Sequence, residues 1–368
     1  MGAVGLVVFT VPTVPAGGGA RRGRRATCGQ PDRLWTTGSA VDWRIAGRMG
    51  AVRNVCVVGL GLIGGSVLRA AAAAGRVTWG ATASQADAEA ARADGFDVVG
   101  VDAALERARV QDALVVVAVP LPAVEDVLRA LPEGLRLTDV VSVKEPVADL
   151  VARLAPHARY VGGHPMAGTS ASGWAAGDAA LFRGAAWVVA ADDGADPDVF
   201  ADVTALALAT GAHVVPASAA EHDAAVARVS HLPHVLAAVL ASVGADGGPL
   251  ALSLAAGSFG DGTRVAGSRP ELVRAMCEGN RGALLDAVDD ALGRLGAARG
   301  SLASTGALAK TIEAGHAARL ALRDRPEPTT ATTVDLTSPD ALEVLRDLGA
   351  RGGRVVALDG TTAHARTS

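Results

Sequence analysis

His164, Ser142 and Arg264 are the side chains whose surroundings best suit chemistry. His164 stands between a glycine and a proline, which predicts a rigid loop rather than the apolar face of a helix. Ser142 and Lys144 follow an apolar run, so we expect them at the carboxyl end of a strand, where open α/β sheets bind ligands. Ser142 could instead cap a helix, and Lys144 could be a solvated charge. Arg264 follows a glycine-rich stretch, where a guanidinium can bind a carboxylate through two parallel hydrogen bonds; the alternative is a surface arginine.

A second group of polar residues stands out further along the chain. His231 and His234 are three residues apart, so they share a helix face if Pro233 lies in the first turn of that helix. The stretch Glu221-His222-Asp223 is also unusual, but its composition alone assigns it no role. Two histidines suggest a metal, yet a third ligand at a suitable spacing is not apparent, so we expect no metal site. The three cysteines are isolated, which fits a reducing cytoplasm and no structural zinc.

Three glycines, Gly59, Gly61 and Gly64, predict the turn around which the rest of the chain is organised. An apolar run precedes them and a helical pattern follows, which is the context of a dinucleotide-binding turn. Gly59 permits the turn, Gly61 lets backbone amides approach a pyrophosphate, and Gly64 lets the helix pack closely on the strand. The amino end of the helix offers unpaired N–H groups and a positive dipole to the anion. The alternative is an ordinary glycine-rich turn.

Strands and helices then alternate as far as residue 215. The predicted strands are 54–58, 77–80, 96–99, 113–119, 137–141, 160–162, 185–190 and 212–215, and the predicted helices are 66–74, 85–93, 123–131 and 147–154. This alternation predicts a doubly wound parallel sheet with helices on both faces. We therefore expect an α/β Rossmann-type dinucleotide-binding domain over residues 49–217.

The composition changes after Pro216, where the strand signals disappear. Ala/Leu-rich stretches predict helices at 221–243, 250–256, 270–295 and 301–322, and thus an all-helical domain over residues 218–323. Residues 324–368 contain proline and threonine clusters and predict a loose C-terminal tail with one short helix. Residues 1–48 predict a disordered extension. We do not expect a secretory signal, because the arginine run follows the apolar run, whereas in a signal the charge comes first.

Composition narrows the partners of this 368-residue chain. Its net charge of −4, without a dense basic face, argues against nucleic acid. We also expect no membrane segment, because no run reaches the roughly 18 uninterrupted apolar residues of a span. Arginine outnumbers lysine 32 to 2, which resembles a coding bias rather than a binding feature. We expect a cytoplasmic protein.

Five blocks of sequence, taken in order, resemble the prephenate/arogenate dehydrogenases of tyrosine biosynthesis. The blocks are Gly59–Ser66, Ser142–Lys144, His164–Thr169, Ser230–His234 and Asp261–Ala266. The resemblance implies a Rossmann-type domain followed by a helical domain that forms a homodimer, with the active site between them. It implies oxidative decarboxylation of prephenate to 4-hydroxyphenylpyruvate, with hydride transfer to NAD(P)+. Arogenate dehydrogenase, which gives tyrosine directly, is the alternative, and tyrosine is implied as a feedback inhibitor at the active site.

The resemblance also assigns roles to residues. It implies that His164 takes the proton of the ring hydroxyl with the support of Ser142. It implies that the substrate is bound by Arg264, His234, His231 and Thr169. It implies that the cofactor is bound by Gly59, Gly61, Leu62, Ile63, Gly64, Thr82, Ser84, Val119 and Pro120.

The cofactor and the class of function keep alternatives. Family members usually end the second strand in an acidic residue that binds the adenosine ribose, but here that stretch offers Thr82, and no arginine follows for a 2′-phosphate. NAD is preferred and NADP stays open. A 3-hydroxyacid dehydrogenase would favour a lysine at the start of the helical domain, and 221–240 contains none. A dinucleotide-sensing module without catalysis would need neither His164 nor Arg264.

Overall fold

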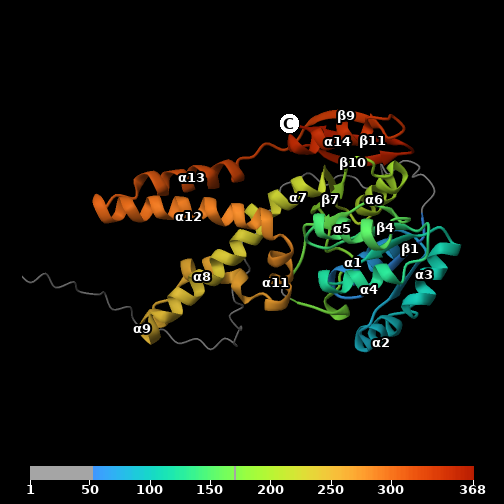
Figure 1. The fold of residues 1–368 in the computed structure, drawn as a ribbon, viewed down its shortest axis with the longest axis horizontal. Helices are drawn as coiled ribbons and strands as arrows, with labels where there is room; N and C mark the ends of the chain where they lie inside the picture. The colour runs from blue at the N-terminus through green and yellow to red at the C-terminus, as the bar shows by residue number, and fades with distance from the viewer. Residues whose placement is uncertain (1–52, 170) are drawn as a thin grey trace, which may run out of the picture. The chain divides into compact units, whose positions relative to one another are not determined.

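A five-stranded parallel sheet forms the first part of the protein in the computed structural model, which describes residues 53–169 and 171–368 (Figure 1). The strands follow the order β2-β1-β3-β4-β5, and every neighbouring pair is parallel. They are β1 (Val55–Val58), β2 (Thr78–Ala81), β3 (Leu114–Val117), β4 (Arg136–Asp139) and β5 (Arg159–Tyr160). The helices between them are α1 (Leu62–Ala73), α2 (Gln85–Ala93), α3 (Val101–Val110), α4 (Leu121–Arg129) and α5 (Glu145–Leu154). The prediction of a Rossmann-type domain is confirmed.

The sheet is buried on both faces, as its continuous apolar strands require. Along β1, Val55 and Val57 belong to one hydrophobic cluster, whereas Cys56 and Val58 belong to a second. Successive side chains of a strand point to opposite faces, so the two clusters lie on opposite sides of the sheet. The carboxyl ends of its strands are thereby left as the edge at which loops can bind a ligand.

Two local predictions in this domain are wrong. The expected strand 96–99 is reduced to a single bridge between Val98 and Gly80. The helix α3 was not expected, although its residues Ala104, Leu105 and Ala108 are buried at helical spacing. Its sequence mixes this narrow apolar stripe with four charged residues, and the stripe becomes clear only once the packed neighbours are known.

A second sheet of six strands follows, in the order β6-β7-β8-β10-β11-β9. Its strands are β6 (Gly163–Pro165), β7 (Ala186–Ala190), β8 (His213–Ala217), β9 (Thr330–Asp335), β10 (Arg354–Asp359) and β11 (Thr362–Thr367). Between them lie η2 (Trp174–Ala176) and α6 (Pro197–Ala209). The prediction that β7 and β8 complete one parallel sheet is wrong, because β6 and β7 are antiparallel and only β7 and β8 run parallel. A buried apolar run predicts a strand but not the sheet that it joins.

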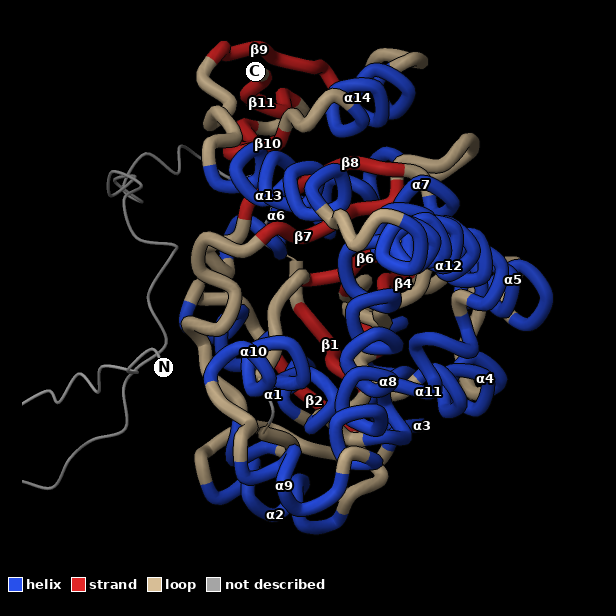
Figure 2. The backbone as a smooth tube through the Cα atoms, turned by 90° about the vertical axis from the view of Figure 1, so that its left-hand side faces the viewer, coloured by secondary structure: helices blue, strands red, loops and turns tan. Residues whose placement is uncertain are grey.

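The C-terminal segment is an integral part of the second sheet, so the prediction of a loose tail is wrong. β10 pairs with β8, β11 with β10 and β9 with β11, and α14 (Ala341–Ala350) lies beside them (Figure 2). Leu345, Leu348 and Val355 are buried in the same hydrophobic cluster as β1 and β7. Only one residue of β9 is buried, and this absence of alternation hides the strand from sequence analysis.

The chain between Ser218 and Arg323 is helical, as predicted. It contains α7 (Ala219–Val226), the π-helical turn η3 (Ala227–His231), α8 (Leu232–Asp246), α9 (Gly248–Ser253), α10 (Gly257–Thr263), η4 (Arg264–Gly267), α11 (Pro270–Gly279), α12 (Arg281–Ser304) and α13 (Ala309–Arg323). Ser218 and Glu221 form a capping box at the start of α7. We keep 217/218 as the proposed domain boundary. The N-terminal extension, residues 1–48, lies outside the described residues.

The continuous helical segment from Ala219 to Asp246 is long and apolar enough, by length and composition, to cross a membrane, with a mean hydropathy of 1.4. The expectation concerned uninterrupted apolar runs, and Glu221, Asp223 and Arg228 interrupt this segment. In addition, His222, Asp223 and His231 in its first half are buried and hydrogen-bonded to other parts of the protein.

Candidate active site

The three glycines of the predicted dinucleotide turn meet three different surroundings. Gly59 has a φ of +101°, and a Cβ there would lie 2.4 Å from the carbonyl oxygen of Ala118. A Cβ on Gly64 would lie 1.9 Å from the carbonyl oxygen of Gly59, so α1 packs directly on the turn. Gly61 faces open space and precedes the first turn of α1 without a side-chain cap. The N–H groups of that turn are therefore free to hold a phosphate, and the residues fit a dinucleotide.

The other predicted cofactor residues lie at the carboxyl ends of neighbouring strands. Thr82 follows β2, and Ser84 caps α2 by accepting a hydrogen bond from the N–H of Asp87 at 3.2 Å. Val119 and Pro120 follow β3, and Leu62 and Ile63 open α1. β1 and its two neighbours thus bring all of these residues to one edge of the parallel sheet.

Lys144 is buried, so its interpretation as a solvated charge is wrong. Its Nζ forms an ion pair with Asp139 and donates a hydrogen bond to the carbonyl oxygen of Gly163 at 2.7 Å. Tyr160 donates its hydroxyl to the other oxygen of Asp139 at 2.7 Å. Since Gly163 is the residue before His164, this buried cluster ties the end of β4 to the strand that presents the histidine. Such a charge is tolerated because each polar atom has a partner.

His164 is the first member of a chain of three side chains. Its Nδ1 lies 2.8 Å from Nε2 of His222, and Nδ1 of His222 lies 2.7 Å from Oδ1 of Asp223. The two imidazole rings meet edge to face at 75°. Asp223 also accepts the backbone N–H groups of Lys144 and Glu145, at 2.8 and 2.9 Å, where α5 begins. The chain therefore runs from a strand of the second sheet through α7 to the amino end of α5.

Hydrogen bonds and burial set the charges along this chain. Burial opposes ionisation of Asp223, but the hydrogen bonds from His222 and from the two backbone N–H groups leave the pKa of Asp223 lower than usual. The pKa of His164 is lowered well below 6.5, first by burial and then by the charges of His222, Lys144 and His231. At neutral pH, Asp223 is therefore an anion and His164 is a neutral imidazole.

His231 is fully buried and has one ring nitrogen without a partner. Nδ2 of Asn280 donates to the backbone oxygen of Asp223 at 2.7 Å and lies 3.1 Å from Nδ1 of His231. Nδ1 of His231 is consequently an acceptor, and the ring proton is on Nε2, which is buried without a hydrogen-bond partner. Burial lowers the pKa of His231 to about 4, so the ring is neutral and carries a single N–H.

His234 and Arg264 come together at the beginning of η4. Burial and the charge of Arg264 lower the pKa of His234, whereas a hydrogen bond with the backbone of Val265 raises it. Arg264 is exposed at the junction of α10 and η4, in helical structure rather than in the expected glycine-rich loop. Pro233 lies in the first turn of α8, as proposed, and the π-helical turn η3 precedes it with His231 at its end.

Thr169 and Ser142, the remaining predicted site residues, make no hydrogen bond to His164 in the described part of the structure. Thr169 lies on an exposed loop, where its hydroxyl accepts the N–H of Ala171 at 3.2 Å. Ser142 is partly buried between β4 and α5, and among the described residues His164 takes His222, not Ser142, as its hydrogen-bonding partner. Within the same described ranges, no group of three or more His, Cys, Asp or Glu side chains is arranged to hold a metal ion.

Sequence analysis missed His222, Asp223 and Asn280. The signal for the first two was present, because a histidine and an aspartate stand side by side in an alanine-rich helix. What could not be seen is that α7 turns both side chains inward, toward His164 and the start of α5. Asn280 gave no signal of its own, because it lies between two helices that the sequence predicted as one.

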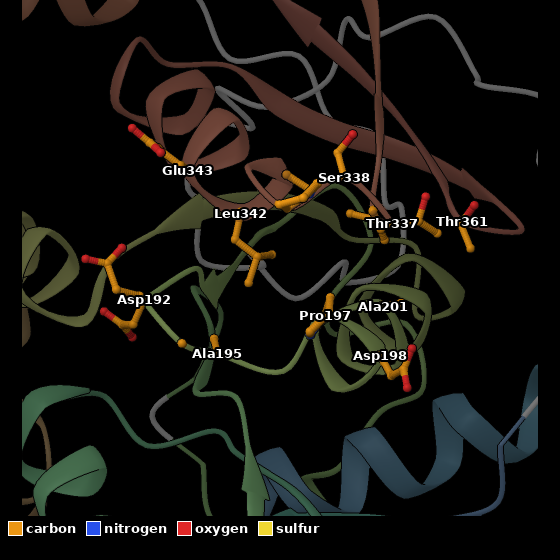
Figure 3. A pocket seen from close by; sticks show the side chains of 15 residues that line it. Asp192, Ala195, Pro197, Asp198, Ala201, Thr337, Ser338, Leu342, Glu343 and Thr361 are labelled. Atoms are coloured by element: carbon orange, nitrogen blue, oxygen red, sulfur yellow. The ribbon is translucent and has the colours of Figure 1, made fainter.

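A cavity lined by other residues lies away from this site. It has a volume of about 440 Å³ and lies between the start of α6 and the C-terminal segment, where Asp192, Thr337 and Glu343 are among its lining residues (Figure 3). None of its lining residues belongs to the His164 chain or to the glycine turn. We therefore assign the chemistry to the polar chain rather than to this cavity.

The fold and the site together define a class of protein: a dinucleotide-binding α/β domain followed by helices that carry part of a buried histidine site. Comparison with known families then narrows the class. The model described as the nucleotide-binding domain of prephenate dehydrogenase matches residues 65–216, and that of its dimerization domain matches residues 218–307. The chain belongs to the prephenate dehydrogenase family.

Individual relatives agree with this assignment. A crystal structure of a Corynebacterium glutamicum protein, provisionally assigned as a prephenate dehydrogenase, is 44% identical, with a TM-score of 0.78, over 83% of this chain and 99% of that one. The prephenate dehydrogenase of Bacillus subtilis is 34% identical over 64% of this chain and 67% of its own length. The cyclohexadienyl dehydrogenase of Zymomonas mobilis is 32% identical over 75% of this chain and 98% of its own length.

Proposed function

We propose that this protein is a prephenate dehydrogenase, which converts prephenate to 4-hydroxyphenylpyruvate and CO2 with reduction of NAD+. The observation that carries the proposal is His164, a neutral, partly buried imidazole that is hydrogen-bonded at Nδ1 and linked through Lys144 to the sheet that forms the dinucleotide turn. A dinucleotide-sensing module would need the turn but not this histidine chain. The family relationship supports the same conclusion.

The roles of the residues in the reaction follow from which of their nitrogen atoms accept and which donate hydrogen bonds. When bound, NAD+ supplies the hydride acceptor. Nε2 of His164 accepts the proton of the ring hydroxyl while the neighbouring C–H bond is broken, as a general base. The N–H of His231 donates to an oxygen of the substrate. Loss of the ring carboxylate as CO2 then makes the ring aromatic, which drives the step forward.

The charge of prephenate gives Arg264 and His234 their proposed roles. Prephenate is a dianion, and a site that excludes water must compensate its carboxylates or bear a large desolvation cost. Arg264 is exposed, lies close to His234 and has a guanidinium suited to a carboxylate. We assign the side-chain carboxylate to this pair, and we keep Ser142 and Thr169 as further contacts to be tested.

Arogenate is the second candidate substrate, since a cyclohexadienyl dehydrogenase is among the relatives. Purified protein should be incubated with prephenate or arogenate, each with NAD+ or NADP+, while absorbance near 340 nm is followed. We expect the fastest reduction with prephenate and NAD+, because Thr82 supplies no positive charge for a 2′-phosphate. No reduction of either cofactor with either substrate would refute the proposed function. Faster reduction with arogenate than with prephenate would identify the protein as an arogenate dehydrogenase instead.

We further propose that the enzyme is a cytoplasmic homodimer joined through its helical domain. Residues Leu236, Val239 and Val243 of α8 are 48%, 54% and 63% exposed, and α9, α12 and α13 expose further large apolar side chains. Exposed apolar side chains concentrated on one group of helices are typical of a protein interface, and a second copy of the chain would cover them. Light scattering after size-exclusion chromatography should give twice the mass of the chain, and a monomer would contradict the proposal.

Tyrosine is the proposed feedback ligand. It resembles the product and carries a carboxylate that the pair of Arg264 and His234 could bind. Inhibition competitive with prephenate, and weakened in Arg264→Ala, would support binding at the active site. Inhibition that prephenate does not relieve would exclude that location.

A further inference from the structure

We propose that His222 and Asp223 act as positioning residues that fix the tautomer of His164 and receive the charge of the proton it accepts. The inference rests on the proposed function and goes beyond it. It assigns a role to two residues for which the sequence suggested none. The chain of contacts from His164 to the start of α5 is the observation behind it.

The proton positions along the chain follow from Asp223. Its two oxygens already accept two backbone N–H groups, and an ionised carboxylate has no proton to donate, so the ring proton of His222 must be on Nδ1. Nε2 of His222 is then a lone pair, which accepts the proton on Nδ1 of His164. Nε2 of His164 is left as the free lone pair. The amino end of α5 therefore determines, through two side chains, that the catalytic nitrogen is a base.

The same three side chains can transfer the positive charge from His164 to His222. When the O–H bond of the substrate breaks and an N–H bond forms at Nε2 of His164, the proton on Nδ1 of His164 can transfer to Nε2 of His222 along the hydrogen bond that joins the two nitrogen atoms, 2.8 Å apart. The positive charge then lies on His222, at 2.7 Å from the carboxylate of Asp223. No atom is lost in this step, because one N–H bond is exchanged for another.

The charged groups around His164 favour this transfer. Lys144 lies on one side, its ammonium bonded to the residue before His164, and His231 lies among the buried groups from the helical domain. The charge of Lys144 opposes a cation on His164, whereas the charge of Asp223 stabilises one on His222. A histidine that merely filled space would need neither the aligned ring nitrogens nor a carboxylate held by two N–H groups.

The critical variant is His222→Gln, because glutamine can keep both hydrogen bonds. Its carbonyl oxygen accepts from Nδ1 of His164 and its amide donates to Asp223, so the tautomer is retained, but it cannot take a proton. We expect kcat to fall roughly 10- to 100-fold, which is less than the usual contribution of a general base, while KM stays within about threefold. His157→Gln, on an exposed loop, is the matched control and should behave as wild type.

The pH profile separates a proton acceptor from a structural contact. In the wild type, a proton accepted by His164 can pass to the second imidazole; in His222→Gln it must stay on His164, beside Lys144. The acid limb of kcat/KM should therefore move to lower pH by about one unit or more, as for strongly coupled groups. His222→Phe, which removes the acceptor altogether, should lose more kcat than His222→Gln.

Asp223→Asn tests the role of the carboxylate charge. The amide oxygen of Asn can still accept from the N–H of Lys144 and from Nδ1 of His222, which share Oδ1 of Asp223, so the tautomers are retained but the charge that stabilises a cation on His222 is lost. We expect kcat to fall about 10- to 100-fold. If the variants fail to fold, histidine ¹⁵N NMR of the wild type, with His164→Asn used for assignment, decides the matter. A proton on Nδ1 of His164 supports the proposal, and a proton on Nε2 overturns it. Wild-type kcat and pH profile in His222→Gln would also overturn it while leaving the proposed function intact.

Discussion

At the scale of single residues, the buried charges of the site are each compensated by a partner. Lys144 and Asp139 form a buried ion pair, and Asp223 accepts three hydrogen bonds. The sequence could indicate His164, because a glycine and a proline flank it, and it could indicate Arg264 after its glycines. It could not indicate Asp223, because the groups that hold this carboxylate are backbone N–H groups some 78 residues earlier in the chain.

Arg264 provides the first prediction. If it binds a carboxylate of the substrate, Arg264→Ala should lose roughly 2–5 kcal/mol of binding, or about 30- to 5,000-fold, chiefly in KM. Arg264→Lys keeps the charge without the planar fork and should recover only part of the loss. Arg269→Ala is the control, because Arg269 is exposed and paired with Glu271. Steady-state kinetics at fixed ionic strength measure all three, and equal small effects for Arg264 and Arg269 would contradict the clamp.

His213 on β8 provides the second prediction. Burial and the charge of Arg354 lower its pKa to about 4, so the folded protein keeps it neutral while the unfolded chain titrates near 6.5. Between those values the unfolded state binds more protons than the folded state. The contribution of His213 to the free energy of unfolding is therefore complete above pH 6.5 and decreases as the pH falls toward 4. His231 adds to the same window.

Urea unfolding measured between pH 4 and 8 checks this prediction. His213→Gln should flatten the pH dependence, whereas His316→Gln, on the exposed face of α13, should leave it unchanged. An identical slope in the wild type and His213→Gln would show that His213 does not carry the effect.

At the scale of the elements, hydrophobic periodicity and the positions of glycine and proline predicted the elements that are long or continuously apolar. α2 begins and ends at the predicted residues, and β1, β3 and the helical domain were expected. The failure at the C-terminal segment has a clear cause: β9, β10 and β11 are stabilised by partners far away in sequence, and their own residues are mostly exposed or only partly buried. Pairing between strands, rather than local hydrophobic alternation, is what forms them.

The contact between α14 and β8 gives a prediction at this scale. A Cβ on Gly349 would lie 1.8 Å from the carbonyl oxygen of Pro216, so the helix touches the strand backbone to backbone. Gly349→Ala should therefore destabilise the protein by about 1–3 kcal/mol through overpacking, despite the better helix propensity of alanine. Gly315→Ala, in α13 with open space around it, should be neutral or slightly stabilising. Thermal unfolding compares the two, and equal melting temperatures would contradict the close packing.

At the scale of the whole molecule, the C-terminal segment connects the stability of the fold to the site. β8 lies between β7 and β10, and the residue after it, Ser218, caps the helix that carries His222 and Asp223. Arg346 of α14 also reaches back, with a hydrogen bond to the carbonyl oxygen of Ala191 and an ion pair with Asp193. The segment that the sequence predicted as a loose tail therefore supports the strand that leads into the active-site helix.

The last prediction follows from this arrangement. A chain that ends at Arg323 loses three strands and α14, and it exposes the buried face against which Leu345, Leu348 and Val355 pack. Full burial of each such side chain contributes about 1.5–3 kcal/mol, and the whole stability of a protein of this kind is about 5–15 kcal/mol. The truncated chain should be insoluble, or should melt far below the full-length protein, and its activity should fall with its folded fraction. Expression of both forms, followed by circular dichroism and the prephenate assay, measures this; a truncated chain with full activity and an unchanged melting temperature would return the segment to the status of a dispensable tail.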